Sequence, residues 1–288
     1  MRATDLYNQL EKDFVTPEMK ENWYDYMNGL DEYICDNFKQ RSIGLLCDFA
    51  EEITKVYTAV FPSDNVLTKV LEDNIQDAMI FLHHPLDWDL SLNPDKAFYE
   101  MNPALLAKLK ERRIALFNFH YPLDNYGEYG NSKTLAEAMD IKIQKPFAKH
   151  CGAFCGVIGI TDCKDVYELN IKYSQAVGHE TKLYKYGDST ITDNKVAIVA
   201  GGGNDAETVN EIIENGINVF ITGLSQNHNY SHVSSREAHA LERENKINLL
   251  GGTHYSSEKF GCIAMCGYFE QLGLESEFIN GTPCFEDL

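Results

Sequence analysis

Four histidines and two carboxylates stand in three short segments, and each segment follows an apolar run of the kind that forms a β-strand. They are His83, His84, His120, Asp124, His254 and Glu258. Neutral imidazoles and carboxylates are ligands that Zn²⁺, Fe²⁺ and Mn²⁺ accept. A single catalytic zinc takes three protein ligands and keeps one position for water, so six ligands suit two ions that share bridging carboxylates. The residue types therefore predict a two-metal site.

The adjacent histidines of the first segment set a geometric condition on this site. Neighbouring residues of an extended chain point to opposite sides. His83 and His84 can therefore serve one site only if the chain bends at Pro85. Without such a bend, one histidine would bind a metal and the other would support it.

The other two segments also allow simpler interpretations. His120 and Asp124 are four residues apart and could form a plain hydrogen-bonded pair. His254 and Glu258 could be a pair at the start of a helix, with Ser256 as its N-cap. The joint placement of all three segments at strand ends favours the metal site.

An α/β fold with a largely parallel sheet must position these segments. From residue 43 onward, short β-branched runs alternate with amphipathic stretches, as such folds require. The expected strands are Ile43–Cys47, Ile53–Phe61, Ala78–Leu82, Ile114–Phe119, Phe154–Ile160, Val196–Ala200, Val219–Thr222 and Ile247–Leu250. The expected helices are Asn65–Asp73, Pro103–Arg113, Ser132–Met139, Asp165–Val177, Asp205–Asn215, Ser234–Asn245 and Ser256–Leu272. Because ligands bind outside the carboxyl ends of strands, we expect the candidate ligands at one sheet edge or at two facing edges.

The order of these elements divides the chain into three parts. Residues 1–40 carry apolar and aromatic residues at helical spacing in Thr4–Phe14 and Pro17–Phe38, which predicts a helical N-terminal extension. Residues 41–150 and 151–288 follow as two α/β lobes. The less regular stretch His150–Asn194 is interpreted as the junction between them.

The acidic balance of the chain excludes several classes of protein. Its 288 residues include 44 Asp and Glu against 25 Lys and Arg, for a formal net charge of −19. Such a chain repels phosphate backbones and anionic membranes, so nucleic acid is not an expected partner. No apolar run reaches the roughly 18 residues of a membrane span, and residues 1–9 do not resemble a signal peptide. We expect a soluble, cytoplasmic protein with a small-molecule substrate.

Two further stretches carry residues whose roles stay open. Gly201–Asp205 lies between a predicted strand and a predicted helix, where a turn can cradle a phosphate; a tight turn with Asp205 as helix cap explains it equally well. It matches no nucleotide-binding fingerprint, and no organic cofactor is expected. His228, His232 and His239 could line the mouth of the site, form a second metal patch, or belong to a solvated loop.

The eight cysteines are expected to be reduced thiols, because no secretory signal accompanies them. Two pairs have three intervening residues, Cys151/Cys155 and Cys262/Cys266. If both pairs lay on helices, each would share a face, and four thiolates could hold a zinc ion. The simpler interpretation is that they are small core residues.

Four motifs, in this order, resemble the Nif-three-like dinuclear metal centre family, whose members are often named GTP cyclohydrolase 1 type 2 homologs. The motifs are HHP at 83–85, HYPLD at 120–124, GGG at 201–203 after a VAIVA strand, and THYSSE at 253–258. The resemblance extends from about Ile43 to about Phe278. The chain departs from the family pattern at Arg41–Leu45, where a DNxGL-like segment is usual, and at Thr222–Leu224, where TGD is usual.

The resemblance implies two related α/β lobes with mixed, largely parallel sheets and a dinuclear metal site in the cleft between them. It assigns two divalent ions (Zn, Fe or Mn) to His83, His84, His120, Asp124, His254 and Glu258. Asp124 and Glu258 are the natural bridging ligands, since a carboxylate has two oxygens. The resemblance also implies a ring-shaped homohexamer, a trimer of dimers.

Two functions from different classes are compatible with such a site. The first is a metal-dependent hydrolase in which a metal-bridged water attacks a small heterocyclic or nucleotide-like substrate. GTP cyclohydrolase chemistry is one version, although so acidic a chain argues against a triphosphate unless the metals and Lys259 carry it. The second is a non-catalytic metal-binding ring protein with a regulatory or partner-binding role. A thiol-based redox protein that uses the spaced cysteine pairs is a third hypothesis.

Overall fold

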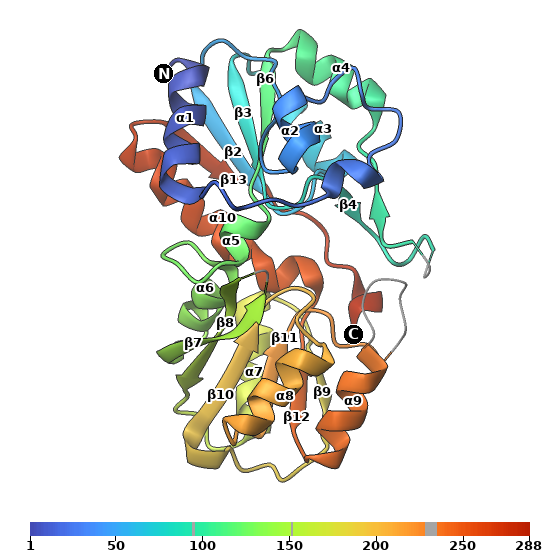
Figure 1. Cartoon of the computed structure of the whole chain (residues 1–288), viewed down its shortest axis with the longest axis vertical. Coiled ribbons are helices and arrows are strands. Elements are labelled where there is room, and N and C mark those ends of the chain that lie inside the picture. The colour runs from blue at the N-terminus through green and yellow to red at the C-terminus, as the bar shows by residue number, and fades with distance from the viewer. Residues whose placement is uncertain (94–95, 151, 228–234) are drawn as a thin grey trace. The chain divides into compact units, whose positions relative to one another are not determined.

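The computed structural model describes residues 1–93, 96–150, 152–227 and 235–288, and these form two compact units. Unit 1 comprises Met1–Asp89, Phe98–Leu123 and Cys262–Gly281, and unit 2 comprises Leu90–Ala97, Asp124–Gly261 and Thr282–Leu288. Each unit has a mixed β-sheet with helices on both faces (Figure 1). The predicted α/β class is therefore confirmed. The sequence predicts a division at residues 40 and 150 into an extension and two related lobes. The two compact units are defined by contacts instead, so this division stays a prediction.

The sheet of unit 1 has five strands in the order β1-β6-β3-β2-β13. Their bounds are β1 Gly44–Cys47, β2 Lys55–Ala59, β3 Ala78–Leu82, β6 Ile114–Asn118 and β13 Glu275–Phe278. The last four strands in that order are parallel, and β1 is antiparallel to β6. Leu82 at the end of β3 pairs with Asn118 at the end of β6. Residues that follow these two strands therefore start from the same edge of the sheet.

Helices cover both faces of this sheet (Figure 1). On one face lie α1 (Ala3–Phe14) and the part of α10 (His254–Gln271) that belongs to unit 1; Tyr7 stacks on Phe117, and Phe269 meets Phe81 edge-on. On the other face, α2 (Asp36–Arg41), α3 (Asp64–Glu72) and α4 (Pro103–Glu111) share one buried core with alternate residues of β3. Because both faces are covered, every residue of β3 is buried, which explains its unbroken apolar run.

The N-terminal extension is only partly helical. The helix predicted at Thr4–Phe14 is confirmed by α1, but the helical structure predicted for Pro17–Phe38 is wrong for most of that stretch. That stretch contains one 3₁₀ turn, η1 (Trp23–Tyr26), and the beginning of α2. Gly29 has φ 73°, a left-handed conformation that interrupts a helix. The aromatic residues instead pack against the core of unit 1 from an irregular backbone.

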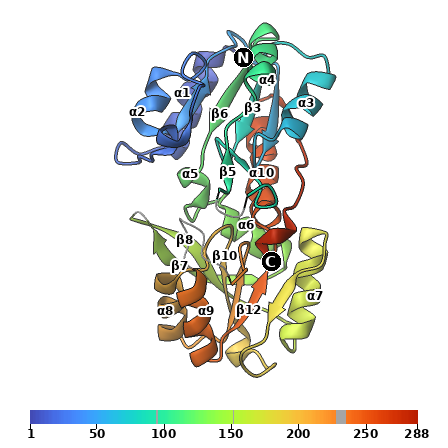
Figure 2. The ribbon, with the colours of Figure 1, turned by 90° about the vertical axis from the view of Figure 1, so that its right-hand side faces the viewer.

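The sheet of unit 2 has six strands in the order β7-β8-β10-β11-β12-β9. Their bounds are β7 Lys142–His150, β8 Ala153–Ile160, β9 Lys182–Tyr184, β10 Lys195–Val199, β11 Val219–Thr222 and β12 Asn248–Gly251. Only β10, β11 and β12 are mutually parallel. Figure 2 shows α7 (Val166–Val177) on one face and α8 (Ala206–Glu214) with α9 (Ser235–Glu244) on the other. The face of α7 also holds α6 (Asn131–Ala138).

The remaining elements are short. They are β4 Asp87–Trp88, β5 Phe98–Tyr99, α5 Tyr121–Asp124, η2 Thr192–Asn194 and η3 Phe285–Asp287. The sequence pattern misses β7, β9 and β13, and all three are edge strands. An edge strand is stabilised by backbone pairing on one side only and commonly carries polar residues, so it shows no apolar run. Within the described ranges, no helix is long and apolar enough to cross a membrane.

The cysteines of the described residues are free thiols. Cys155 lies in strand β8, so the predicted alternative of two helical cysteine pairs is wrong for that pair. Its partner Cys151 lies outside the described residues. Cys262 is buried in α10 and donates its thiol to the carbonyl of Ala59, as a small core residue does.

Candidate metal centre

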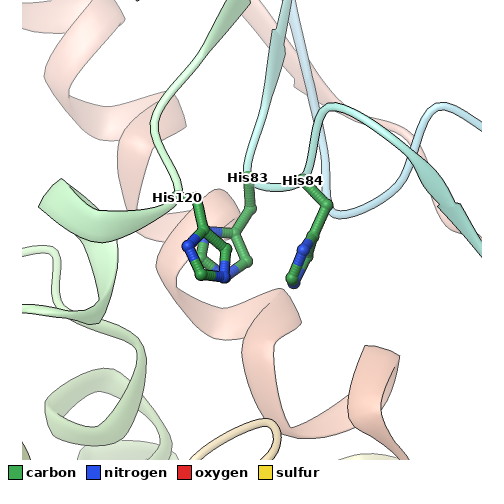
Figure 3. A group of neighbouring side chains, drawn as sticks. All are labelled: His83, His84 and His120. Carbon is green, nitrogen blue, oxygen red and sulfur yellow. The ribbon is translucent and has the colours of Figure 1, made fainter. Parts of the chain in front are cut away.

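Three imidazole rings gather at the ends of two neighbouring strands of unit 1. His83 and His84 directly follow β3, and His120 follows β6. Their ring centroids are 4.4, 4.6 and 4.9 Å apart. One nitrogen from each ring lies within 4.8 Å of the other two, and Figure 3 shows the rings turned toward one another. The structure thus brings together three of the six predicted ligands.

Both members of the adjacent pair belong to this cluster. The strand β3 ends at Leu82, and the backbone bends at His83 and again at Pro85. Because the chain is no longer extended, His83 and His84 project toward the same place with their rings 72° apart. The bend that the sequence requires for a shared site is therefore present.

Backbone and carboxylate oxygens fix the orientation of two of these rings. His83 Nδ1 lies 3.1 Å from the carbonyl oxygen of Phe119, and His120 Nδ1 lies 2.6 Å from Glu21 Oε1. Both oxygens only accept, so each Nδ1 carries a hydrogen, and in the neutral ring Nε2 then carries the lone pair. Histidines that bind metals in proteins are commonly held in this way.

Glu21 is a site residue that the sequence does not reveal. It receives three hydrogen bonds: from His120, from the Tyr121 backbone N–H at 3.1 Å and from Trp23 Nε1–H at 3.0 Å. Burial alone would raise the pKa of Glu21, but His120 and these hydrogen bonds lower it below its usual value. An anionic Glu21 favours the Nδ1–H form of His120. No motif marks Glu21, which lies 99 residues before its partner.

We expect Glu21→Gln to weaken the binding of Zn²⁺ about tenfold, because partners of metal-binding histidines typically contribute ~10–100-fold in affinity. Glutamine has nearly the same shape but presents a neutral acceptor to His120. Titration against a competing chelator measures the change. Glu18→Gln, an exposed residue of the same segment, is the matched control. Equal affinities of Glu21→Gln and the unaltered chain would contradict the prediction.

Two more of the predicted ligands lie on the first turn of α10, within unit 2. The helix begins at His254, two residues earlier than predicted, so His254 and Glu258 share one helix face. Both are buried, and His254 Nε2 lies 3.2 Å from Glu258 Oε2. Ser256 is not the N-cap; the hydroxyl of Thr253 accepts its N–H instead. The earlier start places imidazole and carboxylate side by side.

The glycine-rich turn at residues 201–203 lies against His254 and Glu258, and Gly201 makes the closest approach. Its φ is 70°, and a Cβ there would lie 2.0 Å from Glu258 Oε1 and 3.4 Å from His254 Nε2. Only glycine allows the backbone to approach the carboxylate this closely. Asp205 accepts the N–H of Thr208 and caps α8, as one of the two interpretations of this turn predicts. Imidazole and carboxylate donors packed against such a backbone fit a divalent ion.

Asp124, the remaining predicted ligand, offers a carboxylate oxygen within 4.8 Å of a carboxylate oxygen of Glu258, and both residues belong to unit 2. Asp124 also accepts a hydrogen bond from the amide of Asn131 at 3.1 Å. His239 is fully buried in α9, where it contacts the Tyr186 hydroxyl and the Ser225 carbonyl, so the solvated-loop interpretation is wrong for this residue. His228 and His232 lie outside the described residues.

Comparisons with known proteins point to one family. The profile of the family described as Duf34/NIF3 (NGG1p interacting factor 3) matches residues 31–283. A GTP cyclohydrolase 1 type 2 homolog of Archaeoglobus fulgidus is 27% identical over 263 residues, which cover 90% of this chain and 98% of the relative. One of Borreliella burgdorferi is 28% identical over 226 residues, which cover 78% and 83%.

Solved structures show the same fold. Protein ybgI, of unknown function, gives a TM-score of 0.74 at 20% identity, with 99% of this chain and 100% of that chain covered. Reduced HcgD from Methanocaldococcus jannaschii gives 0.64 at 22% identity, with 98% of each chain covered. At these identities the likeness concerns the fold alone.

Proposed function

The chain belongs to the Duf34/NIF3 (NGG1p interacting factor 3) family, and we propose that it is a dinuclear metal-dependent hydrolase acting on a small heterocyclic or nucleotide-like substrate. The observation that carries this proposal is the cluster of His83, His84 and His120, whose nitrogen atoms converge within 4.8 Å. Three imidazoles whose nitrogens converge present a set of lone pairs to one common ligand. A divalent metal ion is the ligand that suits them.

We assign two ions to the donors of both units. The ligand set consists of His83, His84, His120, Asp124, His254 and Glu258. The chain passes from unit 1 to unit 2 between Leu123 and Asp124, within the segment that carries His120. Within α10 the chain passes back to unit 1 between Gly261 and Cys262, shortly after Glu258. Two of the five points at which the chain passes between the units therefore lie in or beside ligand-bearing segments.

Divalent ions bound there would acidify a water molecule and stabilise negative charge on the substrate. Other groups of the chain set the tautomers of two ligand histidines and leave space for a ligand carboxylate. Glu21 and the Phe119 carbonyl keep His120 and His83 in the Nδ1–H form. Gly201 leaves room for the carboxylate of Glu258.

The cation nearest these ligands in sequence is already engaged. Lys259 Nζ donates to the Val177 carbonyl at the end of α7, at 2.7 Å. Burial lowers the pKa of Lys259, which further weakens its use as an anion clamp. With a net charge of −19, a triphosphate would depend on the metals alone. A substrate with little negative charge fits better, and nucleic acid is not a proposed partner.

The burial of the imidazoles favours a second candidate function. His83 and His84 are 0% and 1% exposed. Ions enclosed so completely could be structural, in a non-catalytic ring protein that regulates or binds a partner. For either function we propose a cytoplasmic homohexamer, as the family resemblance implies.

Metal content tests the proposal. Gently purified protein should contain close to two divalent ions per chain by elemental analysis. His120→Ala in unit 1 and Glu258→Ala in unit 2 should each reduce this content while the fold persists, and His150→Ala, an exposed histidine, should not. A chain without metal, with unchanged ligand variants, would overturn the site. Hydrolysis that survives chelation and His254→Ala would overturn the hydrolase function.

Tryptophan fluorescence gives a local readout for unit 1. The chain has two tryptophans, and the ring of Trp23 lies 4.8 Å from that of His120 and 5.7 Å from that of His84. Co²⁺ added to chelator-stripped Trp88→Phe protein should quench the emission of Trp23. His120→Ala in the same background should abolish that quenching. Quenching that persists would place the ion elsewhere.

A further inference from the structure

The start of helix α10 is held by a carboxylate from the C-terminal turn η3. The backbone N–H of His254 donates to Asp287 Oδ2 at 2.7 Å, and Asp287 is fully buried. The first N–H groups of a helix have no partner within the helix, and a negative charge is favourable beside them. Asp287 supplies both the acceptor and the charge, 33 residues away in sequence.

The same residue holds a second segment of unit 2. The carbonyl of Asp287 accepts the N–H groups of Ser225 and Gln226, at 2.9 and 3.0 Å. The carbonyl of Ser225 in turn lies 2.8 Å from Nε2 of the buried His239. The segment after β11 therefore fixes the backbone carbonyl of Asp287. Its carboxylate has little freedom to follow His254 if that residue moves.

We infer that Asp287 is a positioning residue for the metal ligands His254 and Glu258. His254 is itself the first residue of α10, so the hydrogen bond fixes the backbone atom from which the imidazole extends. Glu258 follows one turn later on the same face, and its carboxylate lies against Gly201. This inference rests on the proposed metal site.

Other contacts at the start of α10 do not replace this one. Thr253 accepts the N–H of Ser256, and the Ser257 hydroxyl donates to the carbonyl of His254. Neither group accepts the N–H of His254. Without Asp287, that buried N–H would lose an acceptor, and the first turn would shift to regain one. The shift would change the geometry of the ligands before it changed the rest of the helix.

Three variants test the inference in the full chain. Asp287→Ala removes the acceptor, Asp287→Asn keeps an oxygen but removes the charge, and Glu286→Gln removes a charge from the exposed neighbouring residue. Co²⁺ affinity is measured by titration against a chelator, and the visible spectrum of bound Co²⁺ reports the coordination geometry. Hydrogen exchange of peptides that cover residues 254–258 reports the helix start without metal.

We expect Asp287→Ala to bind Co²⁺ at least about tenfold more weakly, with an altered spectrum and faster exchange at residues 254–258. Asp287→Asn should recover most of the loss and remain about threefold weaker, since charge-assisted hydrogen bonds are the stronger kind. Glu286→Gln should match the unaltered chain. A purely structural role would lower the melting temperature but leave affinity and spectrum unchanged.

The outcomes separate the two proposals. If the unaltered chain binds Co²⁺ and folded Asp287→Ala binds it equally well with the same spectrum, the inference about Asp287 fails and the metal site stands. If Asp287→Ala does not fold, Asp287→Asn decides, and an affinity equal to that of the unaltered chain overturns the inference. If the unaltered chain binds no Co²⁺, the proposed function fails and this inference with it.

Discussion

Gly201→Ala is expected to reduce the metal affinity of the chain by about 100-fold or more while the protein still folds. A Cβ at this position would lie 2.0 Å from Glu258 Oε1, far inside van der Waals contact. The carboxylate end of Glu258 is the flexible partner in this clash, so it would swing away rather than force the backbone apart. Glu258 would then leave His254, and one of the proposed ligands would be lost.

A matched variant separates this clash from backbone strain. Gly216 also has a left-handed backbone, with φ 66°, but a Cβ there meets no atom within 4 Å. Both Gly→Ala changes should cost about 1–2 kcal/mol of stability from the left-handed backbone. Only Gly201→Ala should release metal, measured by elemental analysis and chelator competition. Equal metal content in the two variants would show that Gly201 does not shape the site.

The histidine cluster of unit 1 could be predicted from sequence because its determinants are local. Two strand ends can be recognised in the sequence. One apolar run ends directly before His83, and another ends directly before His120. Parallel neighbouring strands place their ends at one edge, and β3 and β6 are such neighbours. Pro85 marks where the chain can bend. The residue types, together with the rule that parallel neighbouring strands end at one sheet edge, are enough to predict that these imidazoles lie close together.

The residues that support the ligands could not be predicted, because their contacts depend on tertiary structure. Glu21 comes from an irregular segment and meets His120 across 99 residues. Asp287 lies in a short C-terminal turn and meets His254 across 33 residues. Neither has a periodic pattern or a neighbouring motif. The same limit applies to the edge strand β13, which is recognised only by its pairing with β2.

Unit 2 also contains a buried acid that should make the stability of the protein depend on pH. Glu242 is fully buried in α9, and its Oε2 lies 3.2 Å from His239 Nδ1. Burial raises the pKa of Glu242 to about 8, although Arg243 opposes the shift. Burial also lowers the pKa of His239 below its usual value. Both groups are therefore neutral in the folded protein near pH 7.

The signs of these two shifts decide where stability changes. Folded Glu242 keeps a proton that the unfolded chain loses above about pH 4.5, so its contribution to stability declines as pH rises toward 8. Unfolded His239 gains a proton below about pH 6.5 that the folded residue resists, so its contribution declines as pH falls. The two slopes oppose each other between about pH 4.5 and 6.5. Above pH 6.5 the slope of His239 fades and the slope of Glu242 dominates.

We therefore expect the free energy of unfolding of chelator-stripped protein to fall by about 1 kcal/mol between pH 6.5 and 8. Glu242→Gln is neutral at every pH and has nearly the same shape, so it should abolish this fall. Urea denaturation at a series of pH values measures both profiles, and Glu244→Gln, exposed on the same helix, serves as the control. Parallel profiles for Glu242→Gln and the unaltered chain would mean that Glu242 is ionised in the folded protein. Its negative charge would then have to be stabilised by a protonated His239, and His239→Gln would become the more destabilising of the two changes.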